Sequence, residues 1–278
     1  MSVSATTSLQ VVATPIGNLQ DLSPRGAEAL RLAAIVFAED TRVARTLLAH
    51  VGSHARLESL HEHNERGAAV RLIAALAAGE RVALVSDAGT PLVSDPGAGA
   101  VAAVAQAGYR VEPIPGPSAV VTALSASGFV SVPFAFFGFI ARESAERTAQ
   151  LASMRAFSGA LVFFETKHRL AESLAFCAER LGRDRQALAA RELTKQFETL
   201  YRGTLGELAE LFAREEVKGE LTLVVAPAAA DEAALEDADT VTAELAQDGR
   251  PLTARVKELM LRTGLGRKEA YARLSRGA

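Results

Sequence analysis

Residues 86–97 read Ser-Asp-Ala-Gly-Thr-Pro-Leu-Val-Ser-Asp-Pro-Gly, and this stretch constrains the fold more than any other in the chain. It follows an apolar run over residues 82–85 and precedes a helical pattern over residues 98–107. A strand, a long loop and a helix in this order are typical of α/β folds, which bind ligands at the carboxyl ends of their strands. Ordinary strand-to-helix loops have about 2–6 residues, so the length of this loop favours a binding role over a plain connection. The pair Asp95-Pro96 predicts the helix start, with Asp95 as its N-cap.

Strands and helices alternate through the first part of the chain. Helices are expected to begin at Ser23-Pro24 and near Asn64, where a capping residue precedes a helical pattern. Apolar runs predict strands at residues 9–13, 35–38, 82–85 and 110–114. Repeated βα units of this kind predict a mostly parallel sheet with helices on both faces. We place a domain hinge at residues 115–119, Pro-Gly-Pro-Ser-Ala.

The second half of the chain has a different order of elements. Strands are predicted at residues 134–139, 160–164, 188–191, 197–202 and 221–226. Because two of these strands follow one another without a helix, a mixed or antiparallel sheet is favoured here. The sequence therefore predicts two α/β domains, residues 1–116 and 117–228.

The composition changes after Pro227. Residues 228–249 carry seven acidic residues and no basic one, which indicates a linker or a solvated helix. Residues 250–278 hold eight Arg or Lys against two Glu, with apolar residues at helical spacing on both sides of residues 263–266. This pattern predicts a small basic helix-turn-helix-like unit, which either caps the fold or contacts phosphate. Residues 229–278 thus form an expected third part, an acidic linker followed by a basic helical extension.

Composition also narrows the class of protein. The net charge of −3 over 278 residues means that a nucleic-acid partner would have to bind a local basic patch. The one cysteine, Cys177, leaves no disulfide framework and no cysteine-based zinc site, which favours a reducing compartment. The first residues lack the pattern of a signal peptide, and no apolar run reaches the ~20 residues of a membrane span. We expect a soluble protein of the cytoplasm.

The motifs of several common enzyme classes are absent. The sequence has no G-x-G-x-x-G, no Walker A lysine and no G-x-S-x-G, which argues against dehydrogenases, NTPases and serine hydrolases. His61 and His63 lack a further ligand set, and no metal site is predicted. Three Pro/Gly loops remain, at residues 14–18, 87–97 and 115–119. They could enclose one small ligand with backbone polar groups, and their lack of cations suits an apolar heterocycle with a zwitterionic end.

Eight motifs occur in one order along the chain. They are V-A-T-P-I-G-N-L-Q-D-L-S (12–23), A-E-D-T-R (38–42), L-H-E-H-N-E (60–65), L-V-S-D-A-G-T-P-L-V-S-D-P-G (84–97), P-I-P-G-P-S-A (113–119), T-A-L-S-A-S-G (122–128), F-F-E-T-K-H-R-L (163–170) and A-R-E-L-T-K (190–195). In these motifs the chain resembles the tetrapyrrole methylase superfamily and, within it, the ribosomal RNA small subunit methyltransferase I family. The match is collinear from about residue 9 to residue 226, and the basic end resembles that family's C-terminal extension. The second, third and eighth motifs favour the RNA-modifying branch over the corrin and sirohaem branches.

The resemblance implies a homodimeric enzyme that uses S-adenosylmethionine to methylate the ribose 2′-oxygen of a cytidine in the decoding region of small-subunit (16S) ribosomal RNA. It also implies that the cofactor lies in the cleft between the two α/β domains. Carried over by motif, cofactor contacts fall on Pro15, Ile16, Gly17, Ala88, Gly89, Thr90, Pro91, Val93, Ser118, Ala119, Phe164, Glu165, Leu193 and Gly219. The corrin and sirohaem relatives have Gly-Asp-Pro where this chain has Gly89-Thr90-Pro91, so the Thr90 hydroxyl must replace the hydrogen bonds of a carboxylate.

Methylation of a ribose hydroxyl benefits from a base, or from a cation near the developing oxyanion. The candidates for these roles are Glu39, Asp40, Arg42, His61, His63, Glu165, His168, Glu192 and Lys195. We select Asp40 and Arg42, which either pair with each other or face the substrate, and Lys195, as a group that binds phosphate or stabilises the alkoxide. The substrate is expected to be the assembled small subunit, because the net negative charge gives little long-range attraction to free RNA.

Two alternatives stay open. An enzyme of the same fold could methylate a small macrocycle such as a precorrin, although a macrocycle does not require the basic extension. A ribosome-assembly factor that has lost catalysis is the other possibility, although a pure scaffold has no use for the Gly/Pro loops.

Overall fold

The computed structural model describes residues 7–130, 132–215, 217–228, 238–263 and 265–275. The chain forms two compact units, Met1–Pro227 and Ala228–Ala278. We refer to them as the larger and the smaller unit. The larger unit contains two five-stranded sheets. The predicted division into three domains, at residues 116 and 228, stays a prediction.

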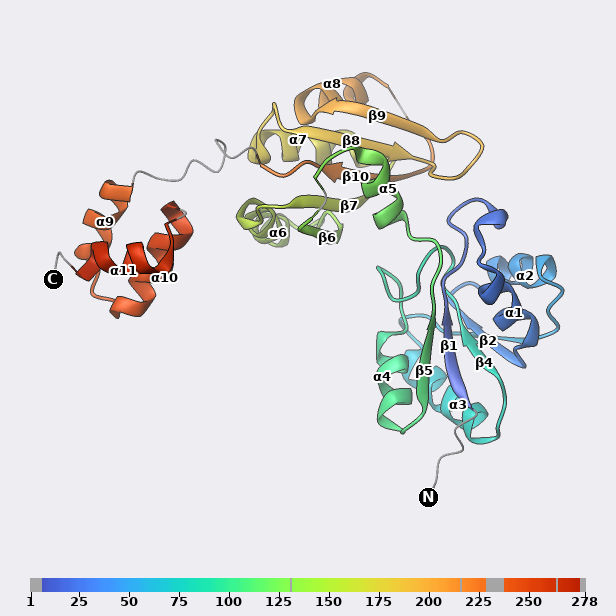
Figure 1. The fold of residues 1–278 in the computed structure, drawn as a ribbon. Helices are drawn as coiled ribbons and strands as arrows, with labels where there is room; N and C mark the ends of the chain where they lie inside the picture. The colour runs from blue at the N-terminus through green and yellow to red at the C-terminus, as the bar shows by residue number, and fades with distance from the viewer. Residues whose placement is uncertain (1–6, 131, 216, 229–237, 264, 276–278) are drawn as a thin grey trace. The chain divides into compact units, whose positions relative to one another are not determined.

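The first sheet is entirely parallel. Its strands run in the order β3 (Arg56–Ser59), β2 (Ile35–Ala38), β4 (Val82–Leu84), β1 (Ser8–Val12) and β5 (Arg110–Ile114). Its helices are α1 (Pro24–Leu32), α2 (Thr41–His50), α3 (Glu65–Ala77) and α4 (Ala98–Gln106), with a short 3-10 helix at Leu19–Asp21. Figure 1 shows α1 and α2 on one side of this sheet and α3 and α4 on the other. The predicted parallel sheet with helices on both faces is therefore confirmed.

Alternation along the strands divides the core of this half into two layers. Phe37 and Leu84 pack against α3 and α4, whereas their neighbours Val36 and Ala83 pack against α1 and α2. Successive side chains of a strand point to opposite faces, so a sheet covered on both sides needs unbroken apolar strands. β2 and β4 are such strands, with every residue buried.

The second sheet is mixed, as predicted. Its strands run in the order β6 (Phe134–Phe139), β7 (Ala160–Thr166), β10 (Glu220–Val225), β8 (Gln186–Arg191) and β9 (Thr199–Thr204). Only the β6–β7 pair is parallel within this sheet. α6 (Ser144–Ala156), α7 (Leu170–Leu181) and α8 (Leu205–Arg214) cover one face, and α5 (Ala119–Ser127) packs on the other. α5 covers only part of its face of the sheet, and the rest of that face is open to a ligand.

The two halves of the larger unit share a hydrophobic cluster. Ile16, in the turn after β1, is buried with Val120 of α5, Val162 of β7 and Leu193, which follows β8. Gly17 packs against the same segment, because a Cβ there would lie 3.0 Å from the Leu193 carbonyl oxygen. The turn after β1 therefore fastens the parallel sheet to the mixed sheet.

The predicted start of α4 was wrong. Its N-cap is Gly97, with φ at 118°, and the helix begins at Ala98, so Asp95 does not cap it. Leu92 and Ser94 also have positive φ, at 72° and 69°. These left-handed residues keep the chain out of a helix until Gly97. The conformation of the whole loop therefore outweighs the local helix-start signal of Asp95-Pro96. The predicted cap at Ser23 is correct, since its side chain accepts a hydrogen bond from Gly26 N.

The smaller unit is a three-helix bundle. It consists of α9 (Ala238–Ala246), α10 (Leu252–Thr263) and α11 (Arg267–Ser275) around a core that includes Val241, Leu259 and Leu274. α10 and α11 form the predicted helix-turn-helix-like pair. α9 lies in the stretch predicted as linker or solvated helix, and the rest of the acidic segment, residues 229–237, falls outside the described residues. No helix in the described ranges is long and apolar enough to cross a membrane.

Candidate active site

Three loops at the carboxyl ends of β1, β4 and β5 are bonded to one another. Thr14 and Gly89 exchange two backbone hydrogen bonds, of 2.8 and 3.1 Å, which tie the first loop to the second. Thr90 Oγ1 donates a 3.0 Å hydrogen bond to the Pro117 carbonyl oxygen, which ties the second loop to the third. Gly116 passes so close to the end of β1 that a Cβ would lie 3.1 Å from Ala13 Cβ. The three Pro/Gly loops thus form one rigid rim.

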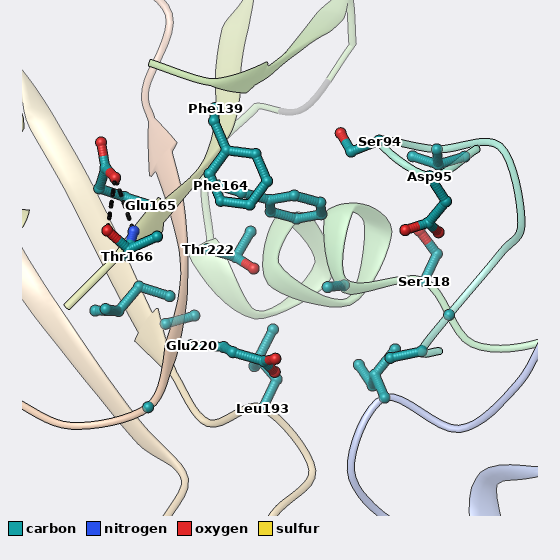
Figure 2. A pocket seen from close by; sticks show the side chains of 18 of the residues that line it. Ser94, Asp95, Ser118, Phe139, Phe164, Glu165, Thr166, Leu193, Glu220 and Thr222 are labelled. Carbon is teal, nitrogen blue, oxygen red and sulfur yellow. Dashed lines mark hydrogen bonds between the residues drawn. The ribbon is translucent and has the colours of Figure 1, made fainter. Parts of the chain in front are cut away.

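A pocket of about 560 Å³ opens beside this rim. One side is formed by the loops, and the other by the free face of the mixed sheet. Figure 2 shows Ser94, Asp95 and Ser118 on the loop side, opposite Phe164, Thr222 and Leu193. Because the walls come from residues far apart in the sequence, the pocket exists only when both halves are folded together.

Aromatic side chains form the far end of the pocket. The Phe164 ring makes edge-to-face contacts with Phe136 and Phe139, with centroids 4.8 and 5.7 Å apart. Phe139 is nearly half exposed and lines the pocket together with Phe164 (Figure 2). Such a cluster offers a flat apolar surface for a planar ring.

Three carboxylates belong to residues that line the pocket, and their surroundings differ. The Glu165 side chain is 0% exposed and accepts hydrogen bonds from Ser173 Oγ at 2.5 Å and Thr166 N at 2.7 Å, the second drawn in Figure 2. Arg169 lies 3.8 Å from it. Glu220 accepts a 3.0 Å hydrogen bond from Lys195 Nζ. Among the described residues, Asp95 makes no ion pair.

The surroundings of Asp95 shift its ionisation. Burial, followed by the nearby Glu39 and Asp87 carboxylates, raises the pKa of Asp95 to about 6, against the opposing effect of a hydrogen bond with Ser86. Burial and Asp87 also raise the pKa of Glu39, while His61 opposes that change. The pocket therefore contains one carboxylate that is more basic than an ordinary aspartate.

Lys195 lies in a strained loop after β8. Its Nζ donates to Glu192 Oε1 at 2.9 Å and to Glu220 Oε2 at 3.0 Å. Glu192 and Thr194 have positive φ values, of 52° and 65°. Burial lowers the pKa of Lys195, but the hydrogen bonds with the two carboxylates outweigh it and raise that pKa overall. Gly219 gives this loop its room, because a Cβ there would lie 2.4 Å from the Glu192 carboxyl group.

Asp40 and Arg42 bind each other at the end of β2. Asp40 caps α2 by accepting from Arg42 N, and the two side chains pair at 2.6 Å. The hydrogen bonds from Arg42 hold the pKa of Asp40 at about 2. Asp40 N in turn donates to Asp87 Oδ1 at 2.9 Å. Of the two arrangements considered for this pair, the structure shows mutual pairing.

Most of the predicted cofactor residues come together in the pocket. Those that line it are Ile16, Ala88, Gly89, Thr90, Val93, Ser118, Ala119, Phe164, Glu165, Leu193 and Gly219. Pro15 and Gly17 instead line a smaller adjoining cavity with Lys195, and Pro91 is buried beside the rim. None of Asp40, Arg42 and Lys195 lines the larger pocket. The binding role of each of these residues stays a prediction.

Several residues that line the pocket were not among the sequence-based candidates. They are Ser94, Asp95, Phe139, Thr166, Lys167, Ala190 and Thr222. Asp95 had been assigned to a helix cap. Ala190 and Thr222 carry a weak signal, a small or polar residue inside a buried strand, which is consistent with space left on that face.

The residues of the pocket fit a nucleoside without phosphates. Its walls are mostly apolar, and Lys167 is the single Lys or Arg among the described residues that line it. A di- or triphosphate would require several cations beside it. An adenosyl group with an amino-acid end matches the combination of aromatic rings, apolar walls and loop backbone.

Comparison with known proteins shows which class of protein has this fold. Residues 8–209 match the family profile described as tetrapyrrole (corrin/porphyrin) methylases. In overall fold the chain is similar to a uroporphyrin-III C-methyl transferase from Thermus thermophilus complexed with S-adenyl homocysteine, with a TM-score of 0.56 and 20% identity over 79% of this chain and 97% of that one. The fold and the pocket thus define a methylase of the tetrapyrrole type.

Nearer relatives define the family within that class. The chain is 46% identical to ribosomal RNA small subunit methyltransferase I of Mesorhizobium japonicum, over 96% of this chain and 91% of the relative. It is 45% identical to the protein of the same name from Xylella fastidiosa, over 95% and 97%. The chain belongs to the ribosomal RNA small subunit methyltransferase I family.

Proposed function

We propose that this protein transfers a methyl group from S-adenosylmethionine to the ribose 2′-oxygen of a cytidine in the decoding region of small-subunit ribosomal RNA. The observation that carries this proposal is the similarity to enzymes of that name along almost the whole chain, including the smaller unit. The coarser statement, an S-adenosylmethionine-dependent methyltransferase of ribosomal RNA, follows from family membership. What we propose beyond family membership is the identity of the methylated atom.

The cofactor would be held by the loop rim and the free face of the mixed sheet. We propose that backbone groups of residues 88–90 and 118–119 bind its polar end, and that Ile16, Phe164 and Leu193 pack against its base. When bound, it supplies an activated methyl group on a sulfonium. The protein's own contribution is to orient the ribose hydroxyl and to exclude water from the pocket.

None of Asp40, Arg42 and Lys195 lines the larger pocket, so the roles proposed for them concern the RNA rather than the cofactor. The Arg42 side chain is 85% exposed at the end of β2, where it can exchange Asp40 for an RNA phosphate. Lys195 would contact phosphate only after leaving Glu192 or Glu220. A Lys195→Ala enzyme with unimpaired turnover would contradict the role of Lys195.

An RNA contact by the smaller unit rests on a separate observation. Arg267, Lys268 and Tyr271 lie one turn apart or less at the start of α11, and all three are exposed. Neither basic residue forms an ion pair within the part of the chain that the structure describes. Cations beside an exposed aromatic ring are suited to phosphates and unstacked bases. We propose that this face of α11 binds ribosomal RNA.

We further propose that the assembled small subunit is the substrate and that the enzyme is a homodimer. The net charge of −3 supports the first part, because recognition then depends on shape and a local patch rather than on long-range attraction. Sedimentation of the purified protein tests the proposed homodimer, and a monomer at micromolar concentration would contradict it.

The experiment is methyl transfer from labelled S-adenosylmethionine to unmodified small subunits and to the same RNA free of protein. The proposal predicts label on one cytidine 2′-oxygen, faster on the subunit than on free RNA. Label in a precorrin but not in RNA would favour the macrocycle methylase. Saturable cofactor binding without transfer to either would favour a non-catalytic assembly factor.

A further inference from the structure

Two exposed cations lie at the edge of the mixed sheet that borders the pocket. β6 and β7 are parallel, so their carboxyl ends meet at the same edge of the sheet. Figure 2 shows the last residues of these strands, Phe139 and Thr166, on the strand side of the pocket, opposite Asp95. Lys167 follows β7 directly and lines the pocket, and Arg142 lies in the segment that leaves β6. Both residues are exposed.

A third cation, Arg169, ties these two segments together. Its Nη2 donates hydrogen bonds to the carbonyl oxygens of Ile140 and Ala141, at 2.8 and 3.3 Å. The same guanidinium lies 3.8 Å from the buried Glu165 carboxylate. A guanidinium with several fixed partners holds its neighbours in place. Arg169 therefore fixes the segment after β6 against the turn after β7.

Arg142 and Lys167 themselves have no partner. Among the described residues, neither side chain forms an ion pair or a hydrogen bond. The Glu220 carboxylate, on the same wall of the pocket, is already paired with Lys195. Glu143, next to Arg142, is exposed and does not cap α6 with its side chain. The two cations are thus available to an anion, and Glu143 is a nearby charge that opposes its binding.

The substrate of the proposed reaction brings anions to this edge of the pocket. Each ribose inside an RNA chain is bonded to a phosphate on both sides, so a ribose that enters the pocket draws those phosphates to its mouth. S-adenosylmethionine carries no phosphate and therefore leaves this requirement to the RNA. Contacts from Lys and Arg to phosphates supply much of the affinity of nucleic-acid-binding proteins and set the position of the strand.

We propose that Arg142 and Lys167 form a phosphate site for the RNA backbone next to the methylated ribose. The inference rests on the proposed function, because it takes RNA as the substrate. Lys167 would bind a phosphate as a point charge, and Arg142 through its planar guanidinium. The phosphate site lies on the mixed sheet, whereas Arg42, proposed above for the same kind of contact, follows a strand of the parallel sheet.

The first test measures binding to unmodified small subunits, without cofactor, at a series of salt concentrations. Lys167→Gln and Arg142→Gln should each weaken binding by about 5- to 10-fold at low salt. Each should also reduce the slope of log affinity against log salt by about 0.7 to 1, the change expected for one phosphate contact. Lys167→Arg keeps the charge and should bind as wild type. Glu143→Gln removes a repulsive charge and should strengthen binding by about twofold.

Arg155→Gln is the matched control for these variants. Arg155 is also an exposed cation without an ion pair among the described residues. It lies in the last turn of α6, roughly 17 Å along the helix from the end near Arg142. The substitution removes the same charge from the same half of the larger unit. Its affinity for small subunits and its salt slope should both equal those of the wild type.

The second test measures methyl transfer to small subunits and binding of S-adenosylhomocysteine. Lys167→Gln and Arg142→Gln should raise KM for the subunit by about the factor seen in binding, with kcat unchanged. The reason is that a phosphate contact is made equally in the bound state and in the transition state. The affinity of both variants for S-adenosylhomocysteine should stay within about twofold of wild type, because the phosphate site contacts the RNA alone.

The outcomes separate the phosphate site from the proposed function. Weaker subunit binding by the two variants, together with no methyl transfer by the wild type, would support the phosphate site and overturn the proposed function. An active wild type whose two variants keep its KM and its salt slope would overturn the phosphate site alone. A marked loss of S-adenosylhomocysteine affinity in Lys167→Gln would make Lys167 a cofactor contact and would also overturn the phosphate site.

Discussion

The two sheets of the larger unit contribute to the pocket in different ways. The parallel sheet supplies loops, whose backbone turns at Gly89 and Gly97 and whose polar side chains reach the ligand site. The mixed sheet supplies the face of its own strands, where Phe164, Ala190 and Thr222 are fixed by the hydrogen-bonded ladder. The comparison shows that the loops provide polar groups to the pocket, whereas the strands provide a rigid surface. Changes on the strand side should cost stability and affinity together, and changes on the loop side should alter affinity or rate with little loss of stability.

The largest loss of cofactor affinity is expected on the strand side, for Phe164→Ala. The variant loses two aromatic contacts and leaves a space in the wall, which should lower the free energy of unfolding by about 2 kcal/mol. Affinity for S-adenosylhomocysteine should fall by about 10- to 100-fold, measured by calorimetry. Phe176→Ala is the matched control, because Phe176 packs on the opposite face of the same sheet. It should lose stability and keep its affinity.

Glu165→Gln should show that this residue supports the strand rather than the ligand. Removing the buried charge beside Arg169 should lower the free energy of unfolding by about 1–3 kcal/mol in urea titrations. Cofactor affinity should stay within about twofold, because the side chain is turned away from the pocket. The exposed Glu172→Gln serves as control. A large loss of affinity with unchanged stability would mean that Glu165 binds the cofactor directly.

Asp95→Asn should stabilise the protein at high pH. The raised pKa means that folding favours the protonated carboxyl, so wild-type stability decreases as the pH rises from about 4 to about 6 and stays reduced above that. Removing the charge should therefore raise the free energy of unfolding at pH 8 by on the order of 1 kcal/mol, allowing for solvent screening. The gain should shrink at pH 5. An equal effect at both pH values would show that Asp95 is not held with a raised pKa.

The smallest effect is expected for Thr90→Val. It removes the hydrogen bond from the Thr90 hydroxyl to the Pro117 carbonyl oxygen, which joins two loops of the rim. Cofactor affinity should fall by about fivefold, with a change in stability of about 1 kcal/mol or less. Thr90→Ser keeps the hydroxyl and should bind as wild type. If Thr90→Val destabilises as strongly as Phe164→Ala, the contrast between loop side and strand side fails.

The sequence predicted the loop side of the pocket better than the strand side. Glycines and prolines punctuate residues 86–97 and 115–119, so the loops were visible without any structure. β3 was missed because Arg56–Ser59 is a short, partly exposed strand without an apolar run. Ala190 and Thr222 were missed because a small residue in a strand does not show what lies beside it. That information is in the packing of α5, which leaves part of the sheet uncovered.

Asp95 shows where local patterns mislead. Asp-Pro before a helical stretch is a strong start signal, and nothing in the adjacent residues contradicts it. The outcome depends on Gly97 and on contacts of the loop with the rest of the fold, which no short window contains. Similarly, the sequence allowed Asp40 and Arg42 either to pair with each other or to face the substrate, and only the side-chain geometry shows that they pair.

The most direct test of the account is a crystal structure of the protein with S-adenosylhomocysteine. We expect the ligand between the loop rim and the strand face, with its adenine near Phe164 and Leu193. A ligand bound outside this pocket would contradict the account.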